Sequence, residues 1–186
     1  MEPEGIALRM TAYPREDSSD IAAFEQIMSQ CERRVLRVAL RLLNNRQDAQ
    51  DAAQEVFLRL YKNLGSLDEE RGYEPWLYRV TVNVCRDIAR SRRRSIGLAE
   101  IPDPPSPQAD ACHDAERAQR REIVRKGLSC LGEKERAAIV LRDVEGLSTR
   151  EVAGILGSSE NTVRSQICSA RLKLRDFTCR LLRRRS

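Results

Sequence analysis

Four prolines fall within the seven residues from Ile101 to Pro107, and they divide the chain into two parts. Proline has no backbone N–H donor and disfavours helical geometry at the residue before it, so this stretch cannot be helical. On both sides of it, apolar residues recur at helical spacing. We therefore predict an all-α protein, in which two small helical domains are joined by a proline-rich linker.

The composition agrees with helical packing. Aromatic residues make up only 4% of the 186 residues, so the core must be built from Leu, Ile, Val and Ala, which favours packed helices over a β-sandwich. The predicted segments are a mobile tail at 1–19, a helical domain at 20–94, a linker that includes the start of a helix at 95–126, a second helical domain at 127–182 and a basic tail at 183–186.

The clearest motif is a helix-turn-helix in the second domain. Ser148 and Glu151 can form the capping box of a short helix, which Gly157 ends. Ala153 is small where two helices would cross closely, and Val163 is β-branched where the second helix would be buried. A helical hairpin that ends at a glycine is the alternative. The basic residues of the second helix favour a helix-turn-helix, because that motif places its second helix in the major groove of DNA.

The second helix of this motif, which follows a predicted cap at Ser159, is strongly basic. Between Asn161 and Ser186, eight basic residues stand against one acidic residue, in a chain with a net charge of +5. The alternative is that these residues are only solvated at a helix end, where the helix dipole favours basic side chains. We expect them to contact the base edges and phosphates of DNA. The predicted DNA-contacting residues here are Asn161, Thr162, Arg164, Ser165, Gln166, Cys168, Ser169, Arg171 and Lys173.

One helix of the first domain suits single-stranded DNA. Bases stack on aromatic rings while arginines follow the backbone, and we expect exposed aromatic side chains at Tyr73, Trp76 and Tyr78. Asn83 lies away from the apolar stripe of the helix. The alternative for Trp76 is a place in the core. The predicted DNA-contacting residues in this helix are Trp76, Arg79, Asn83, Arg86 and Arg90.

Cysteine usage and the N-terminus favour a cytoplasmic protein. Six cysteines are present, and no two of them form a C-x-x-C pair. The acidic N-terminus resembles no secretion signal, and no apolar stretch is long enough to span a membrane. We therefore expect reduced thiols. Four cysteines lie on or beside apolar helix positions and are expected to be buried: Cys31, Cys85, Cys130 and Cys168.

The residue pattern argues against an enzyme. The single histidine, His113, lies beside the linker, and we find no glycine-rich phosphate loop, metal cluster or nucleophile–base pair. Cys112 and His113 together leave a metal or redox site open. We nevertheless predict no catalytic residue, no metal and no cofactor.

Four stretches, in their order along the chain, resemble the extracytoplasmic-function (ECF) group of bacterial sigma factors in the sigma-70 family. They are residues 48–61 (DAQDAAQEVFLRLY), residues 75–87 (PWLYRVTVNVCRD), the basic residues 90–94 (RSRRR), and the segment from LGEKER at 131–136 through Gly157 to TVRS at 162–165. The resemblance extends over about residues 20–182, which is nearly the whole chain.

The resemblance implies a role in transcription initiation. Residues 20–94 would be a sigma region 2 that binds the β′ clamp of bacterial core RNA polymerase through Asp48, Asp51, Glu55 and Leu58. This domain would also open the −10 promoter element and hold a flipped base near Asn83. Residues 127–182 would be a sigma region 4 that contacts the β flap and recognises the −35 element. Members of the group are commonly held inactive by an anti-sigma factor, often membrane-bound, so we expect such a partner.

Three positions depart from the family pattern. Gln166 and Ser169 stand on the recognition helix where arginines are usual, so we expect an unusual or weaker −35 contact. Gly132 stands where a proline usually begins a helix, and we expect a looser helix start there.

A stand-alone helix-turn-helix transcriptional regulator is the main alternative, and it leaves the first domain without a role. Such a regulator binds duplex DNA tightly by itself, whereas a sigma factor of this type requires core polymerase. A helical protein that only binds other proteins is a third reading, against which the basic recognition helix argues.

Overall fold

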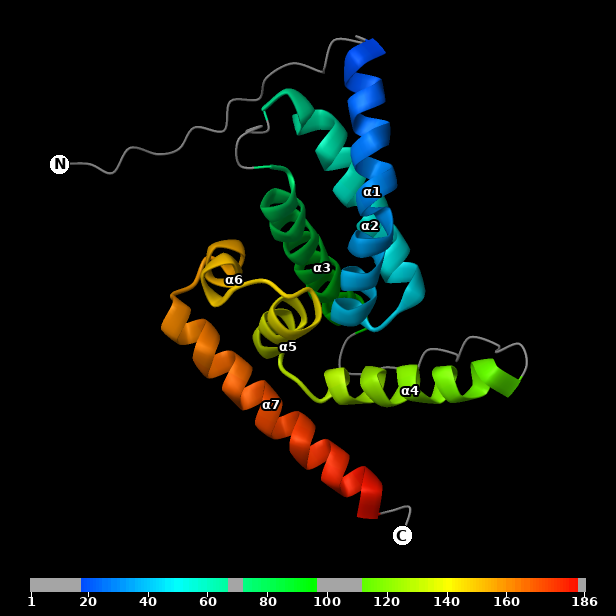
Figure 1. Cartoon of the computed structure of the whole chain (residues 1–186), viewed down its shortest axis with the longest axis vertical. Coiled ribbons are helices and arrows are strands. Elements are labelled where there is room, and N and C mark those ends of the chain that lie inside the picture. Colours follow the sequence, from blue (N-terminus) through cyan, green and yellow to red (C-terminus); the bar gives the residue numbers. More distant parts are fainter. Residues whose placement is uncertain (1–17, 67–71, 97–111, 184–186) are drawn as a thin grey trace, which may run out of the picture.

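A computed structural model of the chain describes residues 18–66, 72–96 and 112–183, and every regular element in these ranges is helical (Figure 1). The all-α prediction is therefore confirmed. Most of the predicted N-terminal tail and the whole stretch from Ile101 to Pro107 lie outside the described residues. The elements are α1 (Ser18–Leu43), α2 (Arg46–Asn63), η1 (Leu64–Ser66), α3 (Glu74–Ile96), α4 (Cys112–Ser129), α5 (Glu133–Ile139), the π-helical turn η2 (Val140–Val144), α6 (Thr149–Leu156) and α7 (Glu160–Arg183).

Two asparagines separate α1 from α2. Asn44 adopts a φ of 56°, in the left-handed region where asparagine is tolerated better than most residues, and this conformation ends α1. The side-chain oxygen of Asn45 then accepts a hydrogen bond from the backbone N–H of Asp48 at 3.0 Å. This cap begins α2 in the opposite direction, so that α1 and α2 pack as an antiparallel pair.

Helices α1, α2 and α3 form an N-terminal bundle with a core of aliphatic and small residues. Alanines at Ala49 and Ala52 are fully buried, which allows the helices to approach closely. The other buried residues of this core are mostly aliphatic, as the low aromatic content predicted. The fully buried large side chains of this core include Val56, Leu60 and Val84.

The C-terminal bundle contains α5, α6 and α7. The α-helical hydrogen bonding of α5 stops at Ile139, and the chain continues as the wider turn η2. The backbone N–H of Glu145 donates to the carbonyl of Val140 at 3.0 Å and closes this turn. A π-helical turn of this kind changes the direction in which the side chains after it point.

Helix α4 packs across α7 at one close point. A Cβ atom at Gly127 would lie 3.2 Å from a methyl carbon of Leu174 and 3.5 Å from the ring of Phe177. The absence of a side chain at Gly127 therefore lets the two helices meet there. Figure 1 shows α4 and the C-terminal half of α7 diverging from this region.

The two bundles are packed against each other and share one apolar core. Val38 and Tyr78 of the N-terminal bundle, together with Val82, belong to the same buried cluster as Leu141 and Val152 of the C-terminal bundle. Helix α3 packs directly against α6 (Figure 1). The prediction of two domains did not include this arrangement, since the residues that make it are far apart in the sequence.

The cysteine prediction was correct for two of the four positions. Cys31 and Cys85 are buried free thiols, and burial raises the pKa of Cys85 to about 12. Cys130 and Cys168, which we expected to be buried, are exposed. Cys130 follows the last turn of α4, and Cys168 lies on the opposite side of α7 from the core, one residue beyond the buried Ile167.

Two leucines of α2 provide a matched test of this core. Leu60 is fully buried, whereas Leu58 is 55% exposed. We expect Leu60→Ala to lower the free energy of unfolding by about 2–5 kcal/mol, because a cavity remains after the loss of a buried side chain. Leu58→Ala should change it by less than about 0.5 kcal/mol. Urea unfolding followed by circular dichroism measures both, and equal losses would contradict the core described here.

Candidate nucleic-acid interface

The turn between α6 and α7 has the geometry of a helix-turn-helix. Gly157 adopts a φ of 61° and donates its backbone N–H to the carbonyl of Ala153, which ends α6 in the left-handed conformation that glycine tolerates. Val163 is fully buried beneath the turn. The three positions that predicted the motif are therefore confirmed in their structural roles.

Both helix starts of the motif carry the predicted caps. The Ser148 hydroxyl accepts from the N–H of Glu151 at 3.2 Å, and the Glu151 carboxylate accepts from the N–H of Ser148 at 2.7 Å. At the start of α7, the Ser159 hydroxyl accepts from the N–H of Thr162 at 3.1 Å. These local bonds hold the recognition helix at a defined angle to α6.

One face of α7 lines an open, basic groove with a volume of about 490 Å³. Four arginines contribute to it, and no acidic side chain does, so the groove suits a polyanion. Its remaining members are Thr149, Ile167, Cys168 and Leu172. The arginines are Arg142, Arg164, Arg171 and Arg175.

The predicted recognition residues divide between two sides of α7. Asn161, Thr162 and Ser165 are exposed near the N-terminal end of the helix, and the groove adds Arg164, Cys168 and Arg171. The side chains of Ser169 and Lys173 point instead toward α5. The Ser169 hydroxyl donates to Glu135 at 2.6 Å, and the Lys173 ammonium donates to both Glu135 oxygens at 2.8 Å.

Glu135 therefore connects α7 to the start of α5. Its carboxylate also accepts from the backbone N–H of Gly132 at 2.9 Å, and this bond caps α5. Hydrogen bonds from Lys173, Ser169 and Gly132 lower the pKa of Glu135 to about 2. The helix start at Gly132, which we expected to be loose, thus has a cap, and Ser169 has a role within the bundle.

The two groove arginines that belong to α7 and were predicted to contact DNA are held by acidic residues in the free chain. Arg164 donates to Glu160 at 2.9 Å and to Asn161 at 3.0 Å. Arg171 donates to both oxygens of Asp143, at 2.7 and 3.0 Å, and this hydrogen bonding raises its pKa. These are exposed ion pairs, which contribute little stability, so phosphates can replace the carboxylates at small cost.

Gln166, another residue predicted to contact DNA, is only partly exposed, and its Oε1 atom is buried.

Two groove residues that lie outside α7 were missing from the predicted set. Arg142 lies in η2, and Thr149 is the first residue of α6. The capping box at Ser148 could have indicated Thr149, because the first backbone N–H groups of a helix favour anions. No sequence signal could have indicated Arg142, since the π-helical turn determines where it points.

Helix α3 presents part of the predicted single-strand site. Asn83 is exposed, as predicted, and so is Arg90. Trp76 is half-buried and packs against the N-terminal core, and Tyr73 is also half-buried. Tyr78, which we expected to be exposed, is 7% exposed because it lies between the two bundles.

Two arginines of the predicted single-strand site contact the other bundle. Arg79 donates to the backbone carbonyl of Gly154 in α6 at 3.0 Å. Arg86 donates to the Glu133 carboxylate at the start of α5 at 3.0 Å. The face of α3 that includes Asn83 is therefore flanked by the C-terminal bundle.

The predicted polymerase-binding residues form an exposed surface on α2, with one exception. Leu58 is exposed, and Glu55 and Asp51 lie about one and two turns before it along α2. Asp48 instead accepts from Arg92 near the end of α3 at 2.8 Å, with both side chains mostly covered.

The described residues contain no cluster of three or more His, Cys, Asp or Glu side chains that could hold a metal ion. Among the helices of these same ranges, none is both long and apolar enough to cross a lipid bilayer.

The fold and this interface together define a helical protein with two bundles and a helix-turn-helix in the second. Two family models match the chain in that order. The model for Sigma-70 region 2 matches residues 27–95, and the model for Sigma-70, region 4 matches residues 121–174.

Curated relatives carry the same family name. The ECF RNA polymerase sigma factor SigE of Mycolicibacterium smegmatis is 33% identical over 169 residues, which are 87% of this chain and 63% of that protein. The RNA polymerase sigma-H factor of Pseudomonas aeruginosa is 30% identical, over 84% of this chain and 86% of that protein. The ECF RNA polymerase sigma factor SigM of Mycobacterium tuberculosis is 31% identical, over 84% of this chain and 78% of that protein.

Solved structures show the same fold. The sigma factor RpoE of Bartonella quintana, in complex with the anti-sigma factor NepR, superposes with a TM-score of 0.67 at 20% identity, over 84% of this chain and 96% of that one. CnrH, in complex with the cytosolic domain of CnrY, superposes with a TM-score of 0.64 at 26% identity, over 85% of this chain and 88% of that one. The chain therefore belongs to the ECF group of RNA polymerase sigma factors in the sigma-70 family.

The connection at Glu135 predicts a pH dependence of stability. The pKa of this carboxyl falls from 4.5 to about 2 on folding, so its contribution is complete above the unfolded pKa and is lost as the pH falls toward about 2. We expect Glu135→Gln to lower the free energy of unfolding at pH 7 by on the order of 1–2 kcal/mol, since the Lys173 partner is partly screened.

The difference between wild type and Glu135→Gln should shrink as the pH is lowered from about 5 to about 3, as urea unfolding would measure. Glu151→Gln, which changes another capping carboxylate of the same bundle, should show a smaller pH dependence, because hydrogen bonds to Ser148 lower the pKa of Glu151 without an ion pair. A difference that stays constant over this pH range would show that Glu135 is not ionised against Lys173.

Proposed function

We propose that this protein directs bacterial core RNA polymerase to specific promoters and helps to open the −10 element. It acts by binding and not by catalysis of its own, in the cytoplasm where the polymerase works. The observation that carries the proposal is the order of surfaces along one chain: an exposed acidic and apolar face on α2, an exposed Asn83 on α3, and a basic groove on α7.

The face of α2 would bind the β′ clamp of the polymerase. Leu58 would enter an apolar depression on the clamp, while Asp51 and Glu55 would pair with basic residues around it. Asp48 contributes indirectly in this proposal, because its ion pair with Arg92 ties the start of α2 to the end of α3. This pairing would hold the polymerase-binding and DNA-binding helices in one orientation.

Helix α3 would hold the separated strand of the −10 element. Asn83 would bond to a flipped base, which requires a few kcal/mol of unstacking that pocket contacts offset. Arg79, Arg86 and Arg90 would follow the phosphates. Trp76 is half-buried, so only its exposed edge is available to a base.

Helix α7 would enter the major groove of the −35 element. The residues nearest its N-terminal end, Asn161, Arg164 and Ser165, would contact base edges, as in other helix-turn-helix proteins. Arg171 and Arg175 would contact phosphates together with Arg142 and Thr149 of the groove. The C-terminal bundle would also contact the β flap.

An anti-sigma factor is a further proposed partner. RpoE of Bartonella quintana was solved in complex with the anti-sigma factor NepR, and CnrH in complex with the cytosolic domain of CnrY. By analogy, we propose that an anti-sigma protein holds this chain inactive until a signal arrives.

Run-off transcription tests the proposed function. Purified chain and bacterial core polymerase, incubated with a genomic fragment library of the source organism, should produce discrete promoter-specific transcripts. Core polymerase alone is the control. The stand-alone regulator remains the alternative, and tight specific binding of duplex DNA by the chain alone, with no run-off product, would favour it.

Asn83→Ala tests the single-strand site. We expect this variant to bind core polymerase as wild type does but to open the promoter at least about tenfold less, because one good base contact is worth about 1–3 kcal/mol. Permanganate footprinting of unpaired thymines measures opening, and co-purification measures polymerase binding. Loss of polymerase binding in this variant would contradict the assignment of Asn83 to DNA.

The two sides of α7 give a second matched pair. Arg164→Ala should weaken binding of the holoenzyme to a −35 duplex by about 1–3 kcal/mol, since Arg164 lies in the groove. Lys173→Ala should weaken it by less than about 0.5 kcal/mol, because Lys173 is paired with Glu135 outside the groove. Fluorescence anisotropy at fixed salt measures both, and a larger loss for Lys173→Ala would contradict the division of the helix.

A further inference from the structure

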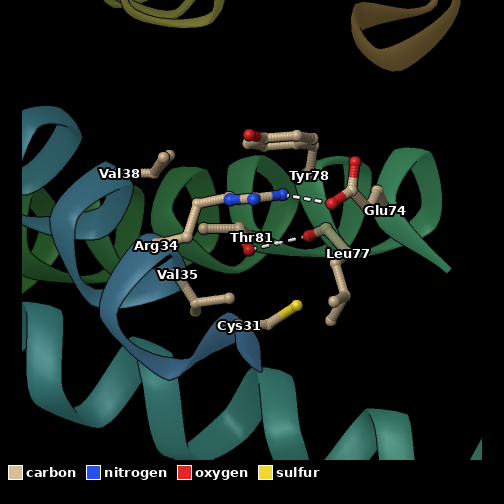
Figure 2. Close-up of a pocket in the computed structure, with 8 residues that line it drawn as sticks. All are labelled: Cys31, Arg34, Val35, Val38, Glu74, Leu77, Tyr78 and Thr81. Atoms are coloured by element: carbon tan, nitrogen blue, oxygen red, sulfur yellow. Dashed lines mark hydrogen bonds and ion pairs between the residues drawn. The ribbon is translucent and has the colours of Figure 1, made fainter. Parts of the chain in front are cut away.

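The N-terminal bundle encloses a cavity that is too small for a ligand. Its volume is about 10 Å³, the lower limit for one water molecule. Figure 2 shows that two polar side chains lining it are already bonded, Arg34 to Glu74 and the Thr81 hydroxyl to the carbonyl of Leu77. The arginine groove of the C-terminal bundle is far larger, and in the free chain two of its arginines already hold an anion.

One of these anions, Asp143, holds Arg171 in the geometry that a phosphate would use. The two carboxylate oxygens of Asp143 accept from Nε and Nη2 of Arg171, at 3.0 and 2.7 Å. These two nitrogens are adjacent donors of the planar guanidinium, and arginine binds carboxylates and phosphates through the same pair of parallel bonds. Asp143 and a DNA phosphate would therefore compete for one edge of Arg171.

Asp143 is fixed beside the groove by its backbone. It lies in η2, where the N–H of Glu145 closes the turn onto the carbonyl of the fully buried Val140. The residue before it, Arg142, lines the groove itself. A phosphate that reaches Arg171 therefore meets the negative charge of Asp143 at close range, even after the ion pair has opened.

The other anion, Glu160, holds its arginine differently. Glu160 lies one turn before Arg164 in α7 and accepts from Nη2 at 2.9 Å, while Asn161 accepts from Nη1 at 3.0 Å. Each of these nitrogens has its own acceptor, and both acceptors direct Arg164 toward the N-terminal end of α7, where base edges are read. Glu160 thus orients its arginine for DNA, whereas Asp143 occupies the edge that DNA needs.

The balance of charge at Arg171 supports the same conclusion. Arg171 and Asp143 together bring no net charge to a duplex, whereas Arg171 without its partner would bring one positive charge. Non-specific binding of duplex DNA depends almost wholly on phosphate contacts, each of which releases about 0.9 counterion. An internal anion at this position therefore weakens binding to DNA of any sequence.

We propose that Asp143 is an internal substitute for a DNA phosphate, which occupies Arg171 in the free chain and so lowers the affinity of the helix-turn-helix for duplex DNA. The inference rests on the proposed binding of DNA in the arginine groove. A genome offers a vast excess of non-specific sites, so a chain with a lower affinity for them remains available to core polymerase. At a cognate promoter, the base contacts of α7 bring a phosphate to Arg171 and displace Asp143. Asp143 is thus a specificity-determining residue that touches no base.

Fluorescence anisotropy with the full chain and a labelled short duplex of mixed sequence tests the proposal. At low salt, Asp143→Asn should bind the duplex roughly fivefold more tightly than wild type, because an exposed ion pair no longer has to open. The slope of log affinity against log salt should steepen by about 0.9, since one more phosphate is neutralised. Asp143→Ala, which also removes the charge, should reproduce both changes.

Glu32→Gln is the matched control, because it changes the net charge by the same amount at an exposed position of α1 in the N-terminal bundle. Its affinity and salt slope should equal those of wild type. Equal changes in Glu32→Gln and Asp143→Asn would overturn the proposal, since net charge alone would then explain them. Wild-type binding by Asp143→Asn would overturn it as well. Urea unfolding followed by circular dichroism verifies that each variant is folded.

A double-mutant cycle separates competition for Arg171 from simple repulsion of DNA. In an Arg171→Ala background, Asp143 has no arginine to occupy, so adding Asp143→Asn should raise the duplex affinity by less than about twofold. The same gain in both backgrounds would show that Asp143 only repels DNA, and it would overturn the competition.

Duplex binding requires no polymerase, so its outcome is independent of the run-off experiment. The expected changes in Asp143→Asn without any run-off transcript would support the role of Asp143 and contradict the proposed function. Run-off transcripts together with unchanged duplex binding by Asp143→Asn would retain the proposed function and overturn this inference.

Discussion

A carboxylate that leaves water needs cations or hydrogen-bond donors around it. In the described part of the chain, Glu145 has these partners in Arg37, Arg41 and Tyr78 of the other bundle. Arg136 has the complementary requirement, because a partly buried cation needs hydrogen-bond acceptors around it. Its half-buried guanidinium donates to the carbonyls of Leu42, Leu128 and Leu131, at the ends of α1 and α4, where the helix dipoles favour a cation. Burial lowers the pKa of Arg136, yet a guanidinium stays charged. These two charges specify how the bundles meet, while the shared apolar core supplies most of the cohesion.

The same principle orients the recognition helix within its bundle. Glu135 caps α5 and binds two side chains of α7, and it thereby supports the orientation in which Val163, Ile167 and Ala170 are buried. The opposite side is then left to form the arginine groove. Arg164 and Arg171 are held there by exposed carboxylates, which keeps the groove ordered without binding its arginines tightly.

Much of the fold was predictable because it depends on neighbours within about four residues. The caps at Ser148 and Ser159, the left-handed turn at Gly157 and the break after Leu43 are local, and the structure confirms the first three as predicted. The predictions for Cys130, Cys168 and Tyr78 were wrong for one common reason. Apolar spacing shows that a residue lies near a stripe, but the helices that pack around it decide whether it is covered.

The sequence by itself determined the all-α class, the two-part organisation, the helix-turn-helix and the family, since each of these follows from local pattern and motif order. Only the tertiary structure decided which residues of those motifs are available. It assigned Ser169 and Lys173 to Glu135, paired Asp48 with Arg92, and added Arg142 to the groove through a π-helical turn. It also brought Glu145 to Arg37 across more than a hundred residues of chain. Contacts of this kind depend on how helices pack in space, and no periodicity within either helix encodes them.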